Sequence, residues 1–174
     1  MSEQPDRSRE LSELCRSCGA CCSGAMFGFV PLVPGEMQIE TRRKLKVFTE
    51  AGGDRFKLPC PGLEAAVCTV YEDRPDVCRG YKCGLYLEHE REGGELAPRL
   101  AKVRRVRELL DTIRAGADES RGEWLPAPIA EIAQWDASRM NTLLERVGPE
   151  VLLDIAELGM RVRRDLGHVP KKEG

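Results

Sequence analysis

Cysteine is the residue whose spacing most clearly points to chemistry in this chain, because four of its eight thiols fall within eight residues. The run Cys15-Arg16-Ser17-Cys18-Gly19-Ala20-Cys21-Cys22 has the spacing CxxCxxCC. The other thiols belong to Cys60, Cys68, Cys78 and Cys83. Thiols this close together serve metal coordination, a disulfide framework or dithiol redox chemistry.

Two of these chemistries fit the sequence poorly. All cysteines precede residue 84, so disulfides could not tie the second half of the chain to the first. Residues 1–10 are polar and lack the apolar segment of a secretory signal. We therefore expect a cytoplasmic protein, in which structural disulfides are rare. Cys15 and Cys18 could form a redox pair, but no thioredoxin-like βαβ pattern surrounds them. A thiol redox enzyme is thus the third hypothesis.

Metal coordination accounts best for the overlapping CxxC units. On a helix, Cys15, Cys18 and Cys22 lie on one face, and Cys21 points away from it. We therefore expect Cys21 and Cys22 to diverge, in different roles or at different metals. The CxxCxxC run is similar to the bacterial ferredoxin spacing, which continues with three residues and Cys-Pro, whereas here Cys22 follows at once. Four-thiolate sites suit zinc and iron–sulfur clusters alike, so the spacing leaves the metal open.

Cations adjoin several of the cysteines in sequence, namely Arg16, Arg74, Arg79 and Lys82. A four-thiolate centre carries net negative charge, which such cations would offset while lowering thiol pKa values. The alternative interpretation is that they are ordinary solvated surface residues.

The cysteine pattern as a whole resembles the CxxCxxCC family, described as zinc- or iron-chelating. The similarity comprises three further segments: Val30–Glu36, Cys60-Pro61-Gly62-Leu63, and the run from Cys68 through Tyr71, Arg74 and Pro75 to Cys78-Arg79 and Cys83. It covers about residues 14–86. The resemblance implies that all eight cysteines are metal ligands: Cys15, Cys18, Cys21, Cys22, Cys60, Cys68, Cys78 and Cys83. Tyr71, Arg74, Pro75 and Arg79 match the family pattern without being ligands.

A short helix is expected to orient Cys78. Asp73 could cap this helix, with Arg74 and Pro75 in its first turn. Tyr71 could pack over the metal site and exclude water. The alternative makes Tyr71 a core residue and Arg74 a structural hydrogen-bond donor.

The pattern of the whole chain predicts a mainly α fold, in which an irregular cysteine-rich lobe precedes a helical hairpin or bundle. We divide it into a disordered tail at 1–13, a metal-binding region at 14–95 and a helical region at 96–174. Apolar spacing predicts helices over about 35–50 and 101–115. Pro126 and Pro128 indicate a further helix start, and Gly148-Pro149 the junction of two antiparallel helices. The β-rich runs, 27–33 and 68–71, are short.

Other functions receive little support from the residues. His89 lies in a charged stretch that we expect to be solvated, and His168 ends the last helix, so neither is expected to be a ligand. The basic segments 102–107 and 161–164 are expected to be solvated, which argues against nucleic-acid binding. No apolar run suits a membrane span. The expected function is metal binding, with no reaction assigned. An iron–sulfur cluster or iron is the first hypothesis for the bound group, and structural zinc is the second. We also expect an unidentified protein partner.

Overall fold

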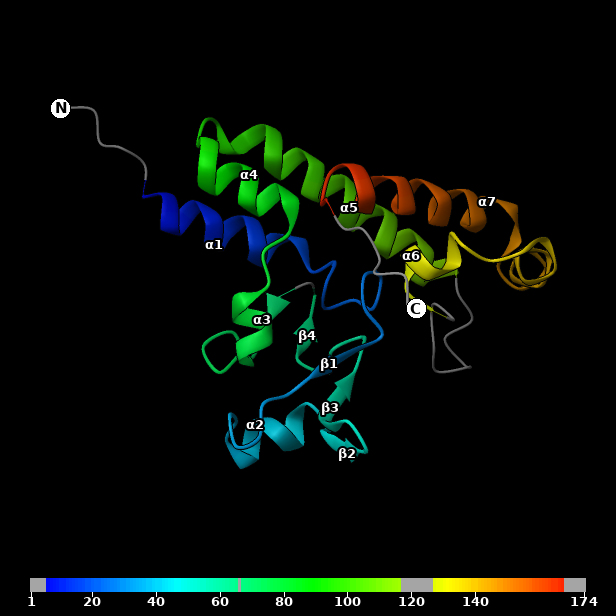
Figure 1. Ribbon diagram of the computed structural model, residues 1–174. Helices are drawn as coiled ribbons and strands as arrows, with labels where there is room; N and C mark the ends of the chain where they lie inside the picture. Colours follow the sequence, from blue (N-terminus) through cyan, green and yellow to red (C-terminus); the bar gives the residue numbers. More distant parts are fainter. Residues whose placement is uncertain (1–5, 66, 117–126, 168–174) are drawn as a thin grey trace.

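The computed structural model describes residues 6–65, 67–116 and 127–167, and this part of the chain is mainly helical (Figure 1). Its helices are α1 (Arg7–Cys18), α2 (Ile39–Lys44), α3 (Asp76–Gly80), α4 (Gly84–Glu92), α5 (Leu96–Gly116), α6 (Ile129–Ile132) and α7 (Ala137–Arg164). The predicted class, mainly α, is therefore confirmed. None of the helices in the described ranges is long and apolar enough to cross a membrane.

Two small antiparallel sheets follow the first cysteine run. Their strands are β1 (Phe29–Pro31), β2 (Phe48–Glu50), β3 (Gly53–Lys57), β4 (Leu63–Glu64) and β5 (Val67–Cys68). The order of the first sheet is β1-β3-β2, with Val30 opposite Phe56, and β4 pairs with β5 so that Leu63 faces Cys68. The second pairing places one cysteine on a strand, so sheet formation helps to position the thiols.

The apolar interior is divided between two clusters. The helical core joins α1, α4, α5, α6 and α7, and its most buried members include Leu14, Leu85, Val106, Ile113 and Leu158. The sheet-side core is much smaller and consists of Val30, Leu32, Leu45, Phe56, Cys60 and Val70. In Figure 1 the helices of the first core lie side by side above the sheets and α2. The cysteines lie where the two cores meet.

The helices that pack on α5 come from both halves of the chain. Helix α1 buries Leu11 and Leu14, three residues apart, and contacts α5, as does α7. Residues 7–13, which we expected to belong to a disordered tail, are therefore the beginning of α1. The expectation failed because polar residues dominate this segment and only its two leucines reveal the buried face. A boundary near residue 95 stays a prediction.

Sequence patterning predicted the later helices better than the earlier ones. Helix α5 contains the predicted segment 101–115. The predicted helix over 35–50 is wrong: only α2 forms, Ile39 is 63% exposed, and Phe48 begins β2. The β-branched and aromatic residues Val47, Phe48 and Thr49 favour an extended chain. The β-rich runs 27–33 and 68–71 contribute only β1 and the end of β5.

The chain does bend at Gly148, whose φ of 80° and ψ of 167° are not helical. The two parts of α7 nevertheless cross instead of lying antiparallel, as the end-on and side-on coils in Figure 1 show. The predicted antiparallel hairpin is therefore wrong, because the chain changes direction at Gly148 without reversing. Pro128 precedes the short α6, whereas Pro126 lies outside the described residues.

An ion-pair network joins α5 to α7 and gives a testable pH dependence. Arg105 Nη2 lies 2.6 Å from Glu157 Oε2, and Arg161 Nε lies 2.8 Å from Glu157 Oε1. Both hydrogen bonds lower the pKa of the Glu157 carboxyl, from 4.5 to about 2, and the bond from Arg105 has the larger effect. Because the folded-state pKa is depressed, the stabilisation is complete above about pH 4.5 and is lost as the pH falls through about 2.

We expect Glu157→Gln to lower the free energy of unfolding slightly at pH 7, since the pairs are partly exposed. The difference from the parent protein should shrink as the pH falls below about 4.5. Urea unfolding at pH 7 and pH 3 measures both effects. Glu108→Gln is the matched control, because Glu108 forms only a 3.4 Å pair with Arg105. A difference that stays constant over this pH range contradicts the assignment.

Candidate metal centre

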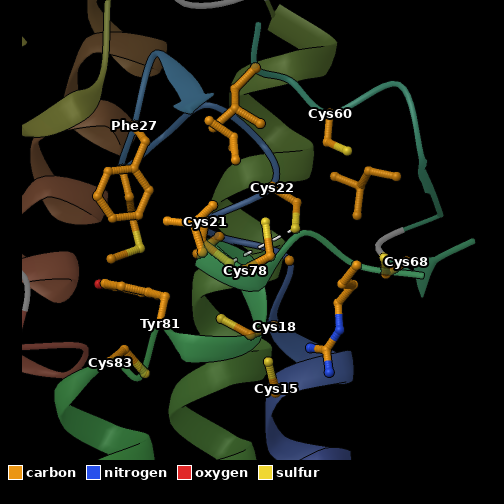
Figure 2. A pocket seen from close by; sticks show the side chains of 18 of the residues that line it. Cys15, Cys18, Cys21, Cys22, Phe27, Cys60, Cys68, Cys78, Tyr81 and Cys83 are labelled. Carbon is orange, nitrogen blue, oxygen red and sulfur yellow. Dashed lines mark hydrogen bonds between the residues drawn. The ribbon is translucent and has the colours of Figure 1, made fainter. Parts of the chain in front are cut away.

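All eight cysteines line one cavity of about 280 Å³ between the helical core and the sheet-side core. Each is a free thiol, and Cys60 is the most buried of them. In Figure 2 they surround a common space, with Cys15, Cys18 and Cys83 toward one end and Cys60 and Cys68 toward the other. We call this space the thiol cavity. Most of its remaining lining is apolar, including Phe27, Met26 and Leu85.

The first four thiols reach the cavity because α1 ends among them. Cys15 and Cys18 are on the last two turns of α1, which ends at Gly19 with a left-handed φ of 66°. A left-handed residue at this position is a usual helix terminator and favours glycine. The chain then turns, with the N–H groups of Cys22 and Ser23 donating to Gly19 O. This turn brings the Cys21 and Cys22 sulfurs to 3.9 Å from each other, close to the end of the helix.

The later thiols arrive on separate short elements. Cys60 follows β3 and donates its backbone N–H to Cys22 O at 2.7 Å, which ties it to the first run. Cys68 is on β5, Cys78 is on α3, and Cys83 immediately precedes α4. Elements this short have few contacts of their own. Hydrogen bonds to other segments therefore help to hold these thiols in place.

Glu36 is a positioning residue that sequence reasoning missed. Its carboxylate accepts hydrogen bonds from the N–H groups of Val33 at 2.7 Å and Asp76 at 2.9 Å. The second bond satisfies the N-terminus of α3, so Glu36 orients the helix that carries Cys78. The prediction that Asp73 caps α3 is wrong, because Pro75 occupies the N-cap position. The proline side chain has no hydrogen-bond acceptor, so it cannot cap the helix. The sequence did contain one indication of this role, because Glu36 ends the Val30–Glu36 segment that resembles the family.

Burial shapes the acid–base properties of the thiols. Burial raises the pKa of Cys15 to about 11 and those of Cys18 and Cys78 to about 12. Burial also raises the pKa values of Cys60 and Cys83. These thiols are therefore protonated at neutral pH, and a metal that binds them must displace protons.

Cys21 differs from the other thiols in the direction of its shift. A hydrogen bond from the Cys22 thiol lowers the pKa of Cys21 and raises that of Cys22. Backbone N–H groups and the charge of Arg74 act in the same direction on Cys21. Cys21 lies at the centre of the cavity in Figure 2, and its lowered pKa favours the thiolate form.

Arg74 lines the cavity, and its charge lowers the pKa values of several thiols, Cys15 and Cys21 among them. Its guanidinium stacks 3.6 Å from the centroid of Tyr71, and its Nε donates to Tyr71 O at 2.9 Å. The Tyr71 hydroxyl is in turn 2.9 Å from Ser12 Oγ on α1. Tyr71 and Arg16 also line the cavity. By contrast, Arg79 bonds the carbonyl groups of Glu72 and Arg74, and Lys82 pairs with Glu90.

We expect Arg74→Gln to slow alkylation of Cys15 in the metal-free, reduced protein, because Arg74 lowers the pKa of that thiol. One pKa unit changes the thiolate fraction about tenfold, so a several-fold decrease in rate is expected at fixed pH. Mass spectrometry of iodoacetamide-treated peptides, repeated across pH, measures the rate. Arg74→Lys is the control that keeps the charge. Equal rates in the Gln variant and the parent protein contradict this role.

Tyr81 in the cavity wall and the burial of His89 were not expected from the sequence. Tyr81 lines the cavity edge-on to Phe27, with 5.1 Å between centroids, and its position two residues before Cys83 was the signal available. His89 is fully buried, not solvated, and its Nε2 lies 3.1 Å from Glu10 Oε2 on α1. His89 follows Leu85 by about one helical turn, so both residues lie on the inward face of α4. His89 does not line the thiol cavity, and His168 lies outside the described residues.

This mainly helical chain carries eight free thiols around one cavity, which is the donor set of a cysteine-cluster site. Residues 14–97 match the CxxCxxCC family model, whose description reads "Putative zinc- or iron-chelating domain". This match supports metal binding as the class of function. No curated protein and no solved structure matches the chain.

Proposed function

We propose that this protein binds an iron–sulfur cluster or iron through the cysteines of the thiol cavity. The observation that carries the proposal is the gathering of all eight thiols around a single, largely apolar space. Thiolates are the usual ligands of iron–sulfur clusters, and no oxygen-rich set competes with them in this cavity. The donor set therefore fits the proposed group.

The spacing of the sulfurs favours a cluster over a single ion. Zinc–sulfur bonds of about 2.3 Å in a tetrahedron place the sulfurs roughly 3.8 Å apart. Among the described residues, no three Cys, His, Asp or Glu side chains gather closely enough to hold one ion. In a [4Fe–4S] cluster each thiolate binds a different iron, so its ligands lie further apart than those of one zinc ion. The cavity also far exceeds the roughly 10–15 Å³ that admits one water molecule.

Structural zinc is the second candidate, and one contact favours it. The Cys21 and Cys22 sulfurs lie 3.9 Å apart, close to the spacing of two ligands on one zinc ion. Rotation of neighbouring side chains could then complete the tetrahedron. In that case the metal holds the sheets against the helices, and the helical region binds a partner.

The chain's own residues have three roles under either assignment. The thiols bind the metal and release protons as they do so. Arg74 offsets the negative charge of the thiolates, and the apolar wall around Phe27 and Tyr81 limits the access of water. A bound iron–sulfur cluster supplies electron transfer or redox sensing, and zinc supplies only structural support.

The test is metal and acid-labile sulfide analysis, with a visible absorption spectrum, on protein purified without oxygen. Iron with sulfide and broad visible absorption supports the proposal. Zinc without sulfide supports the second candidate. A metal-free protein whose thiols form a reversible disulfide overturns both and supports a thiol redox enzyme.

A further inference from the structure

The thiol cavity has two sides, and the cysteines are shared equally between them. On one side Cys18, Cys21 and Cys83 pack against the helical core. On the other, Cys60 belongs to the sheet-side core, and Cys22, Cys68 and Cys78 pack against it. Cys15 is one helical turn before Cys18 and lies beside it in Figure 2, on the side of the helices.

We propose that the cavity holds two metal centres, each bound by four cysteines, an inference that rests on the proposed function. The helical-side group consists of Cys15, Cys18, Cys21 and Cys83. The sheet-side group consists of Cys22, Cys60, Cys68 and Cys78. Four is the number of thiolates that a structural zinc ion and most iron–sulfur clusters take, so eight thiols complete two such sets.

The adjacent pair Cys21 and Cys22 is the boundary between the groups. The turn after α1 directs one side chain toward each core, so neighbouring residues belong to different centres. Their sulfurs nevertheless approach to 3.9 Å, which places the two centres next to each other in one cavity. Cys21 lies centrally among the labelled thiols in Figure 2.

Each group also has its own backbone support. On the sheet side, Gly62 N–H donates to Cys60 Sγ at 3.4 Å, and the Cys60 N–H bonds Cys22 O. On the helical side, backbone N–H groups of Leu85 and Tyr86 at the start of α4 point to the Cys83 sulfur. Such N–H groups stabilise thiolates, so both sides are prepared for a negatively charged ligand set.

The two groups can be separated by serine substitution in the full-length protein. Each variant is reconstituted with ferrous iron and sulfide without oxygen, and its iron content is compared with that of the parent protein. We expect Cys83→Ser and Cys68→Ser each to lose about half of the iron, because each removes one centre. The combination of both substitutions should lose nearly all of it.

One further combination and two further single substitutions test the membership of each group. Cys18→Ser with Cys83→Ser should lose no more iron than Cys83→Ser alone, since both residues bind the same centre. Cys21→Ser should behave like Cys83→Ser, and Cys22→Ser like Cys68→Ser. Ser17→Ala is the matched control in the same run, because Ser17 does not line the thiol cavity. Far-UV circular dichroism checks that each variant is folded.

The outcomes separate this inference from the proposed function. If single substitutions in both groups remove all iron from folded protein, the centre is shared and the division into two is wrong, while the proposed function stands. If only one group affects the iron content, a single four-cysteine centre replaces the two. A parent protein that binds neither iron nor zinc overturns both proposals.

Discussion

Removal of the bound metal is expected to unfold the sheet side of the thiol cavity while the helical core persists. The sheet-side core has six buried members, and its sheets have three and two strands. Structures this small rarely fold without a metal or disulfide. Because the thiol arrangement forms only on folding, metal-binding free energy becomes folding free energy. A free metal concentration about 1,000 times the dissociation constant contributes roughly 4 kcal/mol.

Hydrogen exchange measures this effect segment by segment. In the metal-free, reduced protein, amides of β3 around Phe56 should exchange much faster than in the metal-bound protein. Amides of α5 around Val106 and of α7 around Leu158 should stay protected, because their core consists of apolar contacts. Restoring the metal should restore the protection of β3. Equal protection of β3 in both forms would show that metal does not organise this region.

Sequence reasoning worked best where the buried surface is periodic. Val103, Val106, Leu110 and Ile113 all lie in the interior, as their three- and four-residue spacing predicts. The helix expected over 35–50 has less regular apolar spacing, and its end instead pairs with β3. Strand pairing depends on a partner elsewhere in the chain, which the local sequence does not contain.

At the candidate site too, features set by neighbouring residues could be predicted, whereas contacts between distant segments could not. That the Cys21 and Cys22 side chains leave the backbone in different directions was predictable, although their sulfurs approach to 3.9 Å. Their assignment to two different cores was not, since the sheet-side core forms from residues 30 to 70. The bond from Glu36 to α3 and the burial of His89 against Glu10 also join distant segments. Spacing in the sequence identifies candidate ligands but does not show which of them meet.

The largest effect expected from a single methyl group is at Gly84, where α4 meets the end of α7. Gly84 N–H donates to Leu166 O at 2.6 Å. A Cβ at this residue would lie 2.9 Å from Gly167 Cα and 3.1 Å from Leu166 O. These are backbone atoms, so side-chain rotation cannot relieve the overlap. Alanine is the better helix former by about 1 kcal/mol, but overpacking against a fixed backbone costs about 1–3 kcal/mol.

We therefore expect Gly84→Ala to be destabilising overall and Gly84→Val more so. Chemical unfolding gives the change in free energy of unfolding, and Gly80→Ala is the matched control, since nothing lies within 4 Å of its added Cβ. The control should be neutral or slightly stabilising. Because Cys83 is the residue before Gly84, displacement of α4 should also weaken metal binding on the helical side of the cavity. If Gly84→Ala is as stable as Gly80→Ala, then α4 and the end of α7 are not in close contact, and the position of Cys83 does not depend on that contact.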